Sequence, residues 1–127
     1  MSSPYNSFVF PRTGLEVRNR SVVAAMTNKQ SNPDGTLSDD EINWLLRRAE
    51  GGFGIVTTAA THVVSEGQGW DGEMGVWGDH QLPGLTRLAT GINEHGAVSL
   101  AQIFHGGMRC PQRLTGVQPV SASINPT

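Results

Sequence analysis

Several features that would assign a compartment directly are missing from this sequence. It has one cysteine, Cys110, so no disulfide can form within the chain, as is typical of proteins from reducing compartments. No apolar run approaches the roughly 18 residues of a membrane span, and the N-terminus lacks the basic and apolar pattern of a secretory signal. We therefore expect a soluble, cytoplasmic chain without a membrane partner.

The common catalytic and nucleotide-binding motifs are missing as well. The sequence has no Walker A loop and no GxGxxG, GxSxG, HExxH or CxxC motif. Its four histidines have no metal-ligand spacing, so we predict no metal site. A net charge of −2 gives no reason to expect a nucleic-acid partner.

Glycine, in contrast, is abundant, at 16 of 127 residues. Many of these glycines flank apolar runs, where a strand turns sharply or a ligand approaches the backbone. Hydrophobic residues make up 37% of the chain, which is enough for a core. The length fits one domain, so we treat residues 1–127 as a single unit.

Apolar runs predict three strands and a hairpin. Residues 8–18 alternate around a glycine turn and predict a short hairpin. Residues 21–26, 54–60 and 97–104 are continuous small or apolar runs, which are typical of strands buried on both faces of a parallel sheet.

Two helices are predicted between these strands, at residues 38–50 and 81–94, from apolar residues at helical spacing. The first begins at Ser38, and Glu41 three residues later predicts a capping box. Residues 108–127 have no periodicity and predict an irregular loop after the third strand.

The alternation of strands and helices predicts βαβ units and a parallel sheet. Both a doubly wound sheet and a (β/α)8 barrel fit this order. A barrel needs about 250 residues, so this chain would supply only three of its eight strands. Three strands by themselves leave apolar edges unpaired. The sequence therefore predicts either a very small α/β domain or part of a larger fold.

Residues that can bind a ligand stand at the C-terminal ends of the predicted strands, where ligands bind in parallel α/β proteins. Thr27 and Gln102 can each donate and accept hydrogen bonds, and Gln102 shares a strand face with Phe104. Together they could bind the edge of a planar heterocycle. Structural roles also fit: Thr27 as a turn residue, Gln102 bonding to a buried backbone group, and Phe104 in the core.

Four segments in order resemble the Old Yellow Enzyme family of FMN-dependent ene-reductases. They are the hairpin and first strand at 15–27, the RAEGGFGIV segment at 48–56, the helix entry at 77–85, and the QIFHGG motif at 102–107. The resemblance covers roughly residues 8–110 and corresponds to the N-terminal third of the family. It implies a partial TIM barrel, with the hairpin at the barrel bottom followed by about three βα units.

The resemblance also implies a cofactor and a reaction. The family binds FMN at the C-terminal mouth of the barrel and reduces activated C=C bonds of enones and enals with hydride from NAD(P)H. Carried onto this sequence, Ala25, Met26 and Ala59 would offer backbone groups to the flavin ring. Thr27 would bond near flavin O4 and N5, and Gln102 would bind the pyrimidine edge.

Two further residues would belong to the substrate pocket. Phe104 falls where the family places a pocket residue, and Lys29 falls near a position where some relatives carry a tyrosine. Ala25 replaces the usual proline of the family, and Arg109 is displaced by one position. The family's catalytic residues come later in the chain, so none is expected here.

The resemblance therefore implies an enzyme that works only with a second polypeptide carrying strands four to eight. Two alternatives remain. The chain could be a non-catalytic barrel fragment that acts as an assembly module, or a small α/β domain that binds another planar ligand.

Overall fold

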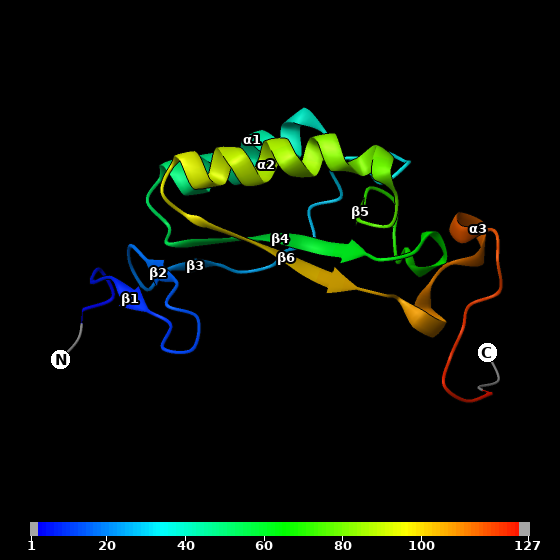
Figure 1. Cartoon of the computed structure of the whole chain (residues 1–127). Helices are drawn as coiled ribbons and strands as arrows, with labels where there is room; N and C mark the ends of the chain where they lie inside the picture. Colours follow the sequence, from blue (N-terminus) through cyan, green and yellow to red (C-terminus); the bar gives the residue numbers. More distant parts are fainter. Residues whose placement is uncertain (1–2, 125–127) are drawn as a thin grey trace.

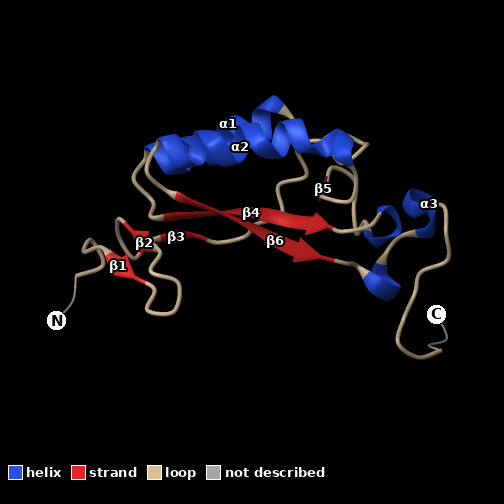
Figure 2. Ribbon diagram, in the orientation of Figure 1, coloured by secondary structure: helices blue, strands red, loops and turns tan. Residues whose placement is uncertain are grey.

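A computed structural model describes residues 3–124 of the chain (Figure 1). The elements are, in order, β1 (Phe8–Val9), β2 (Glu16–Val17), β3 (Val22–Val23), α1 (Asp39–Glu50), β4 (Ile55–His62), η1 (Ser65–Gly67), β5 (Met74–Gly75), η2 (Asp79–Gln81), α2 (Leu82–Glu94), β6 (Val98–Phe104), η3 (Gly107–Arg109) and α3 (Gln112–Thr115). Helices α1 and α2 lie side by side over one face of the strands. The β1–β2 hairpin and α3 lie at opposite ends of the sheet (Figures 1 and 2).

Strand β4 is the centre of a parallel sheet, as the alternating pattern predicts. Its first residues, Ile55 and Val56, lie beside β3 on one edge and beside β6 on the other. Its last two residues pair with β5 on the β3 side, at the opposite end of the strand. Because β5 has only two residues, it is too short for a periodic pattern in the sequence to predict it.

Strand β3 is shorter than the predicted run of residues 21–26. Only Val22 and Val23 pair with β4. Directly beyond the partner residue Val56, the β4–β6 register shifts between Thr57 and Ala60, with one extra residue on β4. We attribute the early end of β3 to this bulge, because a displaced backbone in β4 removes its regular partners.

Helix α1 is capped as predicted, but the expected capping box is only half formed. Ser38 Oγ accepts a hydrogen bond from the Glu41 N–H at 3.1 Å. The Glu41 carboxylate is buried and turns away from the cap. It accepts bonds from Asn28 Nδ2 at 2.9 Å and from Ser31 Oγ. The prediction for Glu41 is therefore wrong in part, because burial against the β3–α1 loop offers its carboxylate two donors there.

The segment after β6 is more ordered than the irregular loop predicted for residues 108–127. It contains η3 and the one-turn helix α3, which ends at Gly116 with φ +75°. Arg113 of α3 pairs with Asp71 at 3.3 Å at the surface, which is a contact between positions far apart in the sequence. Residues 125–127 of the predicted loop lie outside the described part of the chain.

The core lies between the sheet and the two helices. It consists of Val23, Leu37, Ile42, Leu45, Ala49, Val56, Met74, Leu88, Ile92 and Ala97. Strand β6, in contrast, is poorly covered. Leu100 is 53% exposed on one face of the strand. Ile103, three residues later and therefore on the other face, is 73% exposed. Apolar surface on both faces of an edge strand is the form expected of a sheet that continues into further strands.

This uncovered strand predicts self-association. Expressed by itself, the chain should form soluble oligomers or aggregates, because β6 presents apolar side chains and unpaired backbone groups. Light scattering after size-exclusion chromatography would measure the mass. The double substitution Leu100→Lys and Ile103→Lys should reduce association, since charges at an edge oppose strand pairing. A 13.6 kDa monomer with a cooperative melt would contradict this prediction.

Candidate functional site

The carboxyl ends of the parallel strands lie at one edge of the sheet, which we call the mouth (Figure 2). In the β4–β6 ladder, Ala60 lies beside Gln102, and His62 lies beside Phe104. Since β3 runs parallel to β4, residues 25–27 follow it toward the same edge. The mouth therefore combines segments that are far apart in the sequence.

The β4 bulge shapes the centre of the mouth. Thr58 Oγ1 accepts a hydrogen bond from the Gln102 N–H at 3.2 Å and donates one to the Ala59 carbonyl at 2.7 Å. Ala59 therefore lies in an irregular stretch whose backbone is held by side chains. Bulges of this kind are frequent beside binding sites, where they redirect the backbone. The methyl groups of Ala59 and Ala60 add little bulk to this surface.

The polar side chains predicted at the mouth are free to bind a ligand. Thr27 and Gln102 are both exposed, and neither side chain has a hydrogen-bond partner within residues 3–124. Gln102 therefore does not bond to a buried backbone group. Ala25 is half-buried and Met26 is 49% exposed, without strand pairing.

Lys29 has an unusual backbone at the mouth. Its φ of 55° is the only positive value for a non-glycine residue in the described chain, and its side chain is exposed. The carbonyl of Lys29 lies so close to Gly72 that a Cβ there would meet it at 2.6 Å. The Ser31 N–H also bonds to the Gly72 carbonyl at 3.2 Å. The loops after β3 and β4 are thus packed tightly together, and strained residues of this kind cluster at functional sites.

Phe104 forms an aromatic pair that the sequence did not reveal. Its ring centroid lies 5.2 Å from that of Trp70, with the planes inclined at 49°. Gly69 is packed against the same ring, since a Cβ at Gly69 would approach Phe104 to 3.1 Å. We call Trp70 and Phe104 the aromatic wall. The pair joins a loop to a strand, so no spacing rule predicts it.

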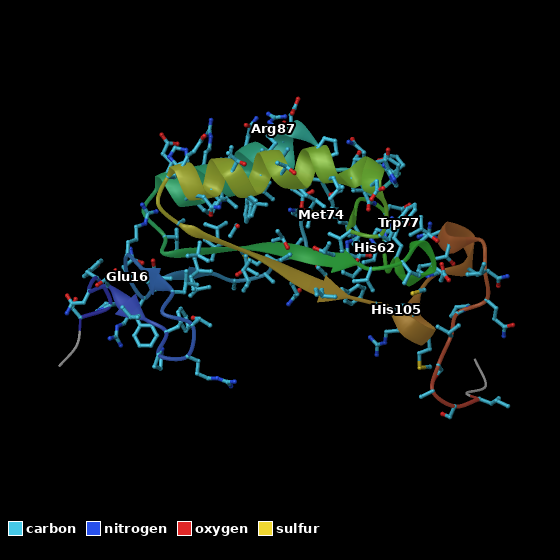
Figure 3. All side chains as sticks on the ribbon, in the orientation of Figure 1. Glu16, His62, Met74, Trp77, Arg87 and His105 are labelled. Carbon is cyan, nitrogen blue, oxygen red and sulfur yellow. The ribbon has the colours of Figure 1, made fainter. Side chains whose placement is uncertain are left out.

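A buried polar cluster lies directly behind this wall. His62 and Glu73 are only 2% and 1% exposed, and His62 Nδ1 lies 3.9 Å from Glu73 Oε2. Trp77 Nε1 donates to His62 Nε2 at 3.0 Å, and the Gly69 N–H donates to Glu73 Oε2 at 2.6 Å. Figure 3 shows His62, Met74 and Trp77 close together where β4 ends.

The cluster is electrostatically unusual. Burial raises the pKa of Glu73 to about 7, against the opposing bonds from the backbone of Gly69 and Trp70. Burial lowers the pKa of His62, and the backbone of Met74 opposes this in part. Within residues 3–124, neither His62 Nδ1 nor Glu73 Oε1 has a hydrogen bond of regular geometry. Neither residue belongs to a sequence motif, because His62 is the last residue of β4 and Glu73 is a lone carboxylate in a glycine-rich loop.

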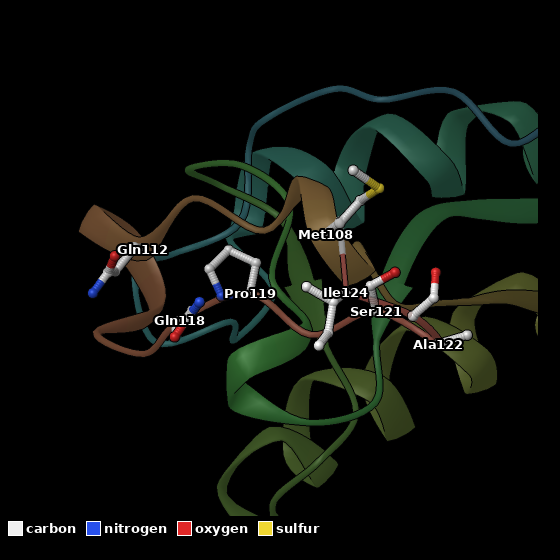
Figure 4. Close-up of a pocket in the computed structure, with 8 residues that line it drawn as sticks. Met108, Gln112, Gln118, Pro119, Ser121, Ala122 and Ile124 are labelled. Atoms are coloured by element: carbon white, nitrogen blue, oxygen red, sulfur yellow. The ribbon is translucent and has the colours of Figure 1, made fainter. Parts of the chain in front are cut away.

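Two open pockets lie away from the mouth, in the C-terminal segment. A cavity of about 670 Å³ is formed by the C-terminal segment, lined by residues such as Met108, Gln112, Pro119 and Ile124 (Figure 4). A second cavity of about 460 Å³ adjoins it at Met108 and reaches His105. None of the predicted ligand-binding residues lines either of these two pockets.

Two kinds of feature are absent from the described residues. Within residues 3–124, no group of three or more His, Cys, Asp or Glu side chains is placed to hold a metal ion. Over the same residues, no helix is both long enough and apolar enough to cross a membrane.

Comparison with known sequences identifies relatives over most of the chain. The profile of the NADH:flavin oxidoreductase / NADH oxidase family matches residues 13–127. A probable NADH-dependent flavin oxidoreductase of Bacillus subtilis is 37% identical over 116 residues, which is 91% of this chain and 31% of that protein. The NADH:acrylate oxidoreductase of Vibrio harveyi is 34% identical over 97% of this chain and 12% of its own length.

Comparison with solved structures gives the same result. An Old Yellow Enzyme homologue from Zymomonas mobilis superimposes with a TM-score of 0.89 and 25% identity, over 98% of this chain and 34% of that protein. The predicted fold, the first part of a β/α barrel, is therefore confirmed. The chain spans about a third or less of the length of each of these relatives.

The raised pKa of Glu73 predicts a pH-dependent stability. The folded state favours the protonated carboxyl, so this contribution is fully present below the unfolded pKa near 4.5 and is lost as pH rises through about 7. The change corresponds to about 3 kcal/mol, and Glu73→Gln should abolish it. Urea unfolding of the folded protein between pH 4 and pH 8 would measure it. Glu66→Gln, in the exposed part of the same loop, is the control and should keep the loss of stability as pH rises through about 7, because the lowered pKa of Glu66 acts only at acid pH. A loss over this range that survives in Glu73→Gln would contradict the assignment.

Proposed function

The chain belongs to the NADH:flavin oxidoreductase / NADH oxidase family, and we propose that it forms the flavin-ring side of an FMN-dependent ene-reductase. The proposed enzyme reduces activated C=C bonds, as in enones and enals, with hydride from NAD(P)H. One observation carries the proposal. Thr27 and Gln102 present unpartnered hydrogen-bonding side chains at the carboxyl-end edge of one parallel sheet.

The residues at the mouth fit a flavin ring. Isoalloxazine is flat and has donors and acceptors along its edge, so it needs small residues beneath it and neutral polar groups beside it. Ala25 and Ala59 meet the first need, and Thr27 and Gln102 meet the second. Backbone groups of Met26 complete the proposed set. When bound, FMN would supply the redox chemistry, accepting hydride from NAD(P)H and delivering it to the alkene.

The protein's own groups would then act by binding and orientation. The Thr27 hydroxyl would donate toward the ring carbonyl on which negative charge grows during reduction. The Gln102 amide would donate and accept along the pyrimidine edge and so fix the ring in its plane. Phe104, backed by Trp70, would form one wall of the substrate pocket and exclude water, and exposed Lys29 would stand at the rim.

The proposal also requires the rest of the barrel. The exposed apolar residues Leu100 and Ile103 on β6 need further strands to cover them. We propose that strands four to eight supply this cover together with the proton donor, and that a second polypeptide carries them. The same open strand favours the alternative of an assembly module that holds its partner without turnover.

A reconstitution experiment tests this function. The chain would be co-expressed with the remaining two thirds of the Bacillus subtilis relative, and the complex examined for bound flavin and for enone-dependent oxidation of NADH and NADPH. A yellow complex that reduces the enone is the expected result. A stable colourless complex would favour the assembly module, and a stable colourless monomer would favour an independent small domain.

Gln102→Leu should weaken FMN binding in that complex by about 5- to 150-fold. The substitution leaves polar flavin atoms unpaired in a partly dry site, at a cost of roughly 1–3 kcal/mol. Flavin fluorescence during titration of the apoprotein would give the dissociation constant. Gln112→Leu makes the same chemical change on exposed α3 and should leave binding unchanged. Equal affinities for the two variants would refute the role of Gln102.

Thr27→Ala should lower the reduction potential of the bound flavin while FMN remains bound. A hydrogen bond that strengthens on reduction contributes roughly 1–3 kcal/mol, or about 20–60 mV for two electrons. Spectroelectrochemical titration would measure the potential, and stopped-flow absorbance the slower reduction by NAD(P)H. Thr90→Ala, an exposed threonine on α2, is the matched control. An unchanged potential in Thr27→Ala would show that its hydroxyl does not face the ring.

A further inference from the structure

Glu73 is buried behind the aromatic wall but has no place in the proposed chemistry. Its carboxylate is held on one side only. Oε2 accepts the Gly69 N–H at 2.6 Å and the Trp70 backbone also favours the ionised carboxylate, whereas Oε1 has no hydrogen bond within residues 3–124. A buried carboxyl with half its acceptors unused is costly to maintain, so its retention calls for a physical role.

The neighbour of Glu73 is equally incomplete. Trp77 Nε1 donates to His62 Nε2, so in neutral His62 the proton must reside on Nδ1. Within the described residues that Nδ1 has no hydrogen bond of regular geometry; it lies 3.9 Å from Glu73 Oε2, and the Met74 backbone is the other polar group acting on His62. Both residues are at least 98% buried. The donor on His62 and the acceptor on Glu73 therefore face each other at a distance longer than a hydrogen bond, with the Met74 backbone as the competing group.

A direct chain of contacts leads from this pair to the wall. Gly69, whose N–H is held by Glu73, packs against the Phe104 ring closely enough that a Cβ would lie 3.1 Å from it. Trp70 follows Gly69 and stacks on the same ring. His62 also lies beside Phe104 in the β4–β6 ladder. A change in the strength of the Gly69 bond is therefore transmitted to both rings of the wall.

We propose that Glu73 is a positioning residue, whose pairing with His62 fixes Gly69 and through it the aromatic wall, so that the shape of the substrate pocket follows the protonation state of this buried pair. This inference rests on the proposed function, because it takes Phe104 as a pocket wall. Ionised Glu73 holds the Gly69 N–H by a charge-assisted bond, and protonated Glu73 holds it more weakly. Gly69, and with it the rings of Trp70 and Phe104, should thus be held more firmly above neutral pH than below it.

The other ionisable groups around the pair are few. Cys110 follows η3, and its thiol pKa is raised by burial and further by Glu73. His105, at the end of β6, lies over Gly67 and near exposed Glu66. Asp71 is paired with Arg113 of α3 at the surface. None of these groups lies between Glu73 and Gly69. The titration that changes the position of the aromatic wall through Gly69 is therefore that of Glu73.

The test follows the wall and the reaction separately in the reconstituted flavoprotein. The NMR resonance of the Trp70 indole N–H, identified with Trp70→Phe, is recorded from pH 5.5 to 8.5. The enantiomer ratio of the product from a 2-methyl cyclic enone is measured over the same range. Both should change together with a midpoint near pH 7, and the product ratio should change severalfold. Glu66→Gln should leave both curves in place, whereas Glu73→Gln should make both flat.

Three results would overturn the proposal: a Trp70 resonance that does not move with pH, curves that persist in Glu73→Gln, or a moving resonance with a constant product ratio. Where Glu73→Gln does not fold, His62→Phe serves as the second variant. It removes the Nδ1–H donor that favours ionised Glu73, so the midpoint pH of both titration curves should rise. An unchanged midpoint pH would contradict the pairing. Failure of the proposed function is seen differently, as a complex without flavin or turnover, and the Trp70 titration can still be read in that complex. Where the chain instead folds by itself, the same titration is run on the chain.

Discussion

The guanidinium of Arg18 connects several parts of this fold at one end of the sheet. It donates to the carbonyls of Ala49, Phe53 and His95, at 2.5, 2.7 and 2.6 Å. Ala49 lies in the last turn of α1 and His95 caps α2, so one cation satisfies the carbonyl ends of both helices. Arg18 directly follows β2 and lies shortly before β3. The hairpin, both helices and the start of the sheet therefore share one polar contact point at this end, and a planar guanidinium with several donors suits this task.

Buried carboxylates perform the corresponding task at the mouth. Glu41 accepts bonds from Asn28 and Ser31 and so fixes the loop that carries Thr27 and Lys29. Glu73 accepts the Gly69 N–H and so fixes the loop behind Phe104. The two loops meet where Lys29 packs on Gly72. The fold thus has a rigid closed end and a mouth whose loops are held by a few buried polar groups, which is the arrangement a ligand site requires.

Much of the fold follows from local patterns. The small apolar runs before residues 60 and 104 predict β4 and β6, and the spacing of Ile42, Leu45 and Ala49 predicts the buried stripe of α1. The positions of Thr27 and Gln102 at strand ends also follow from these patterns, and the family resemblance gives them a cofactor. The errors lie where a partner distant in the sequence decides the structure: β5, the early end of β3, the side chain of Glu41, and helix α3, whose Arg113 pairs with Asp71.

The sequence by itself determined the order of strands and helices, the family, and the residues that reach the mouth, because each depends on neighbours a few positions apart or on motifs in fixed order. Only the tertiary structure decided that Trp70 backs Phe104, that the Gln102 amide is free, and that His62 and Glu73 face each other in the interior. These facts depend on how a glycine-rich loop returns to the sheet. The pKa of a buried carboxyl such as Glu73 is set by the groups that the folded loop places around it, and a local sequence pattern does not specify those groups.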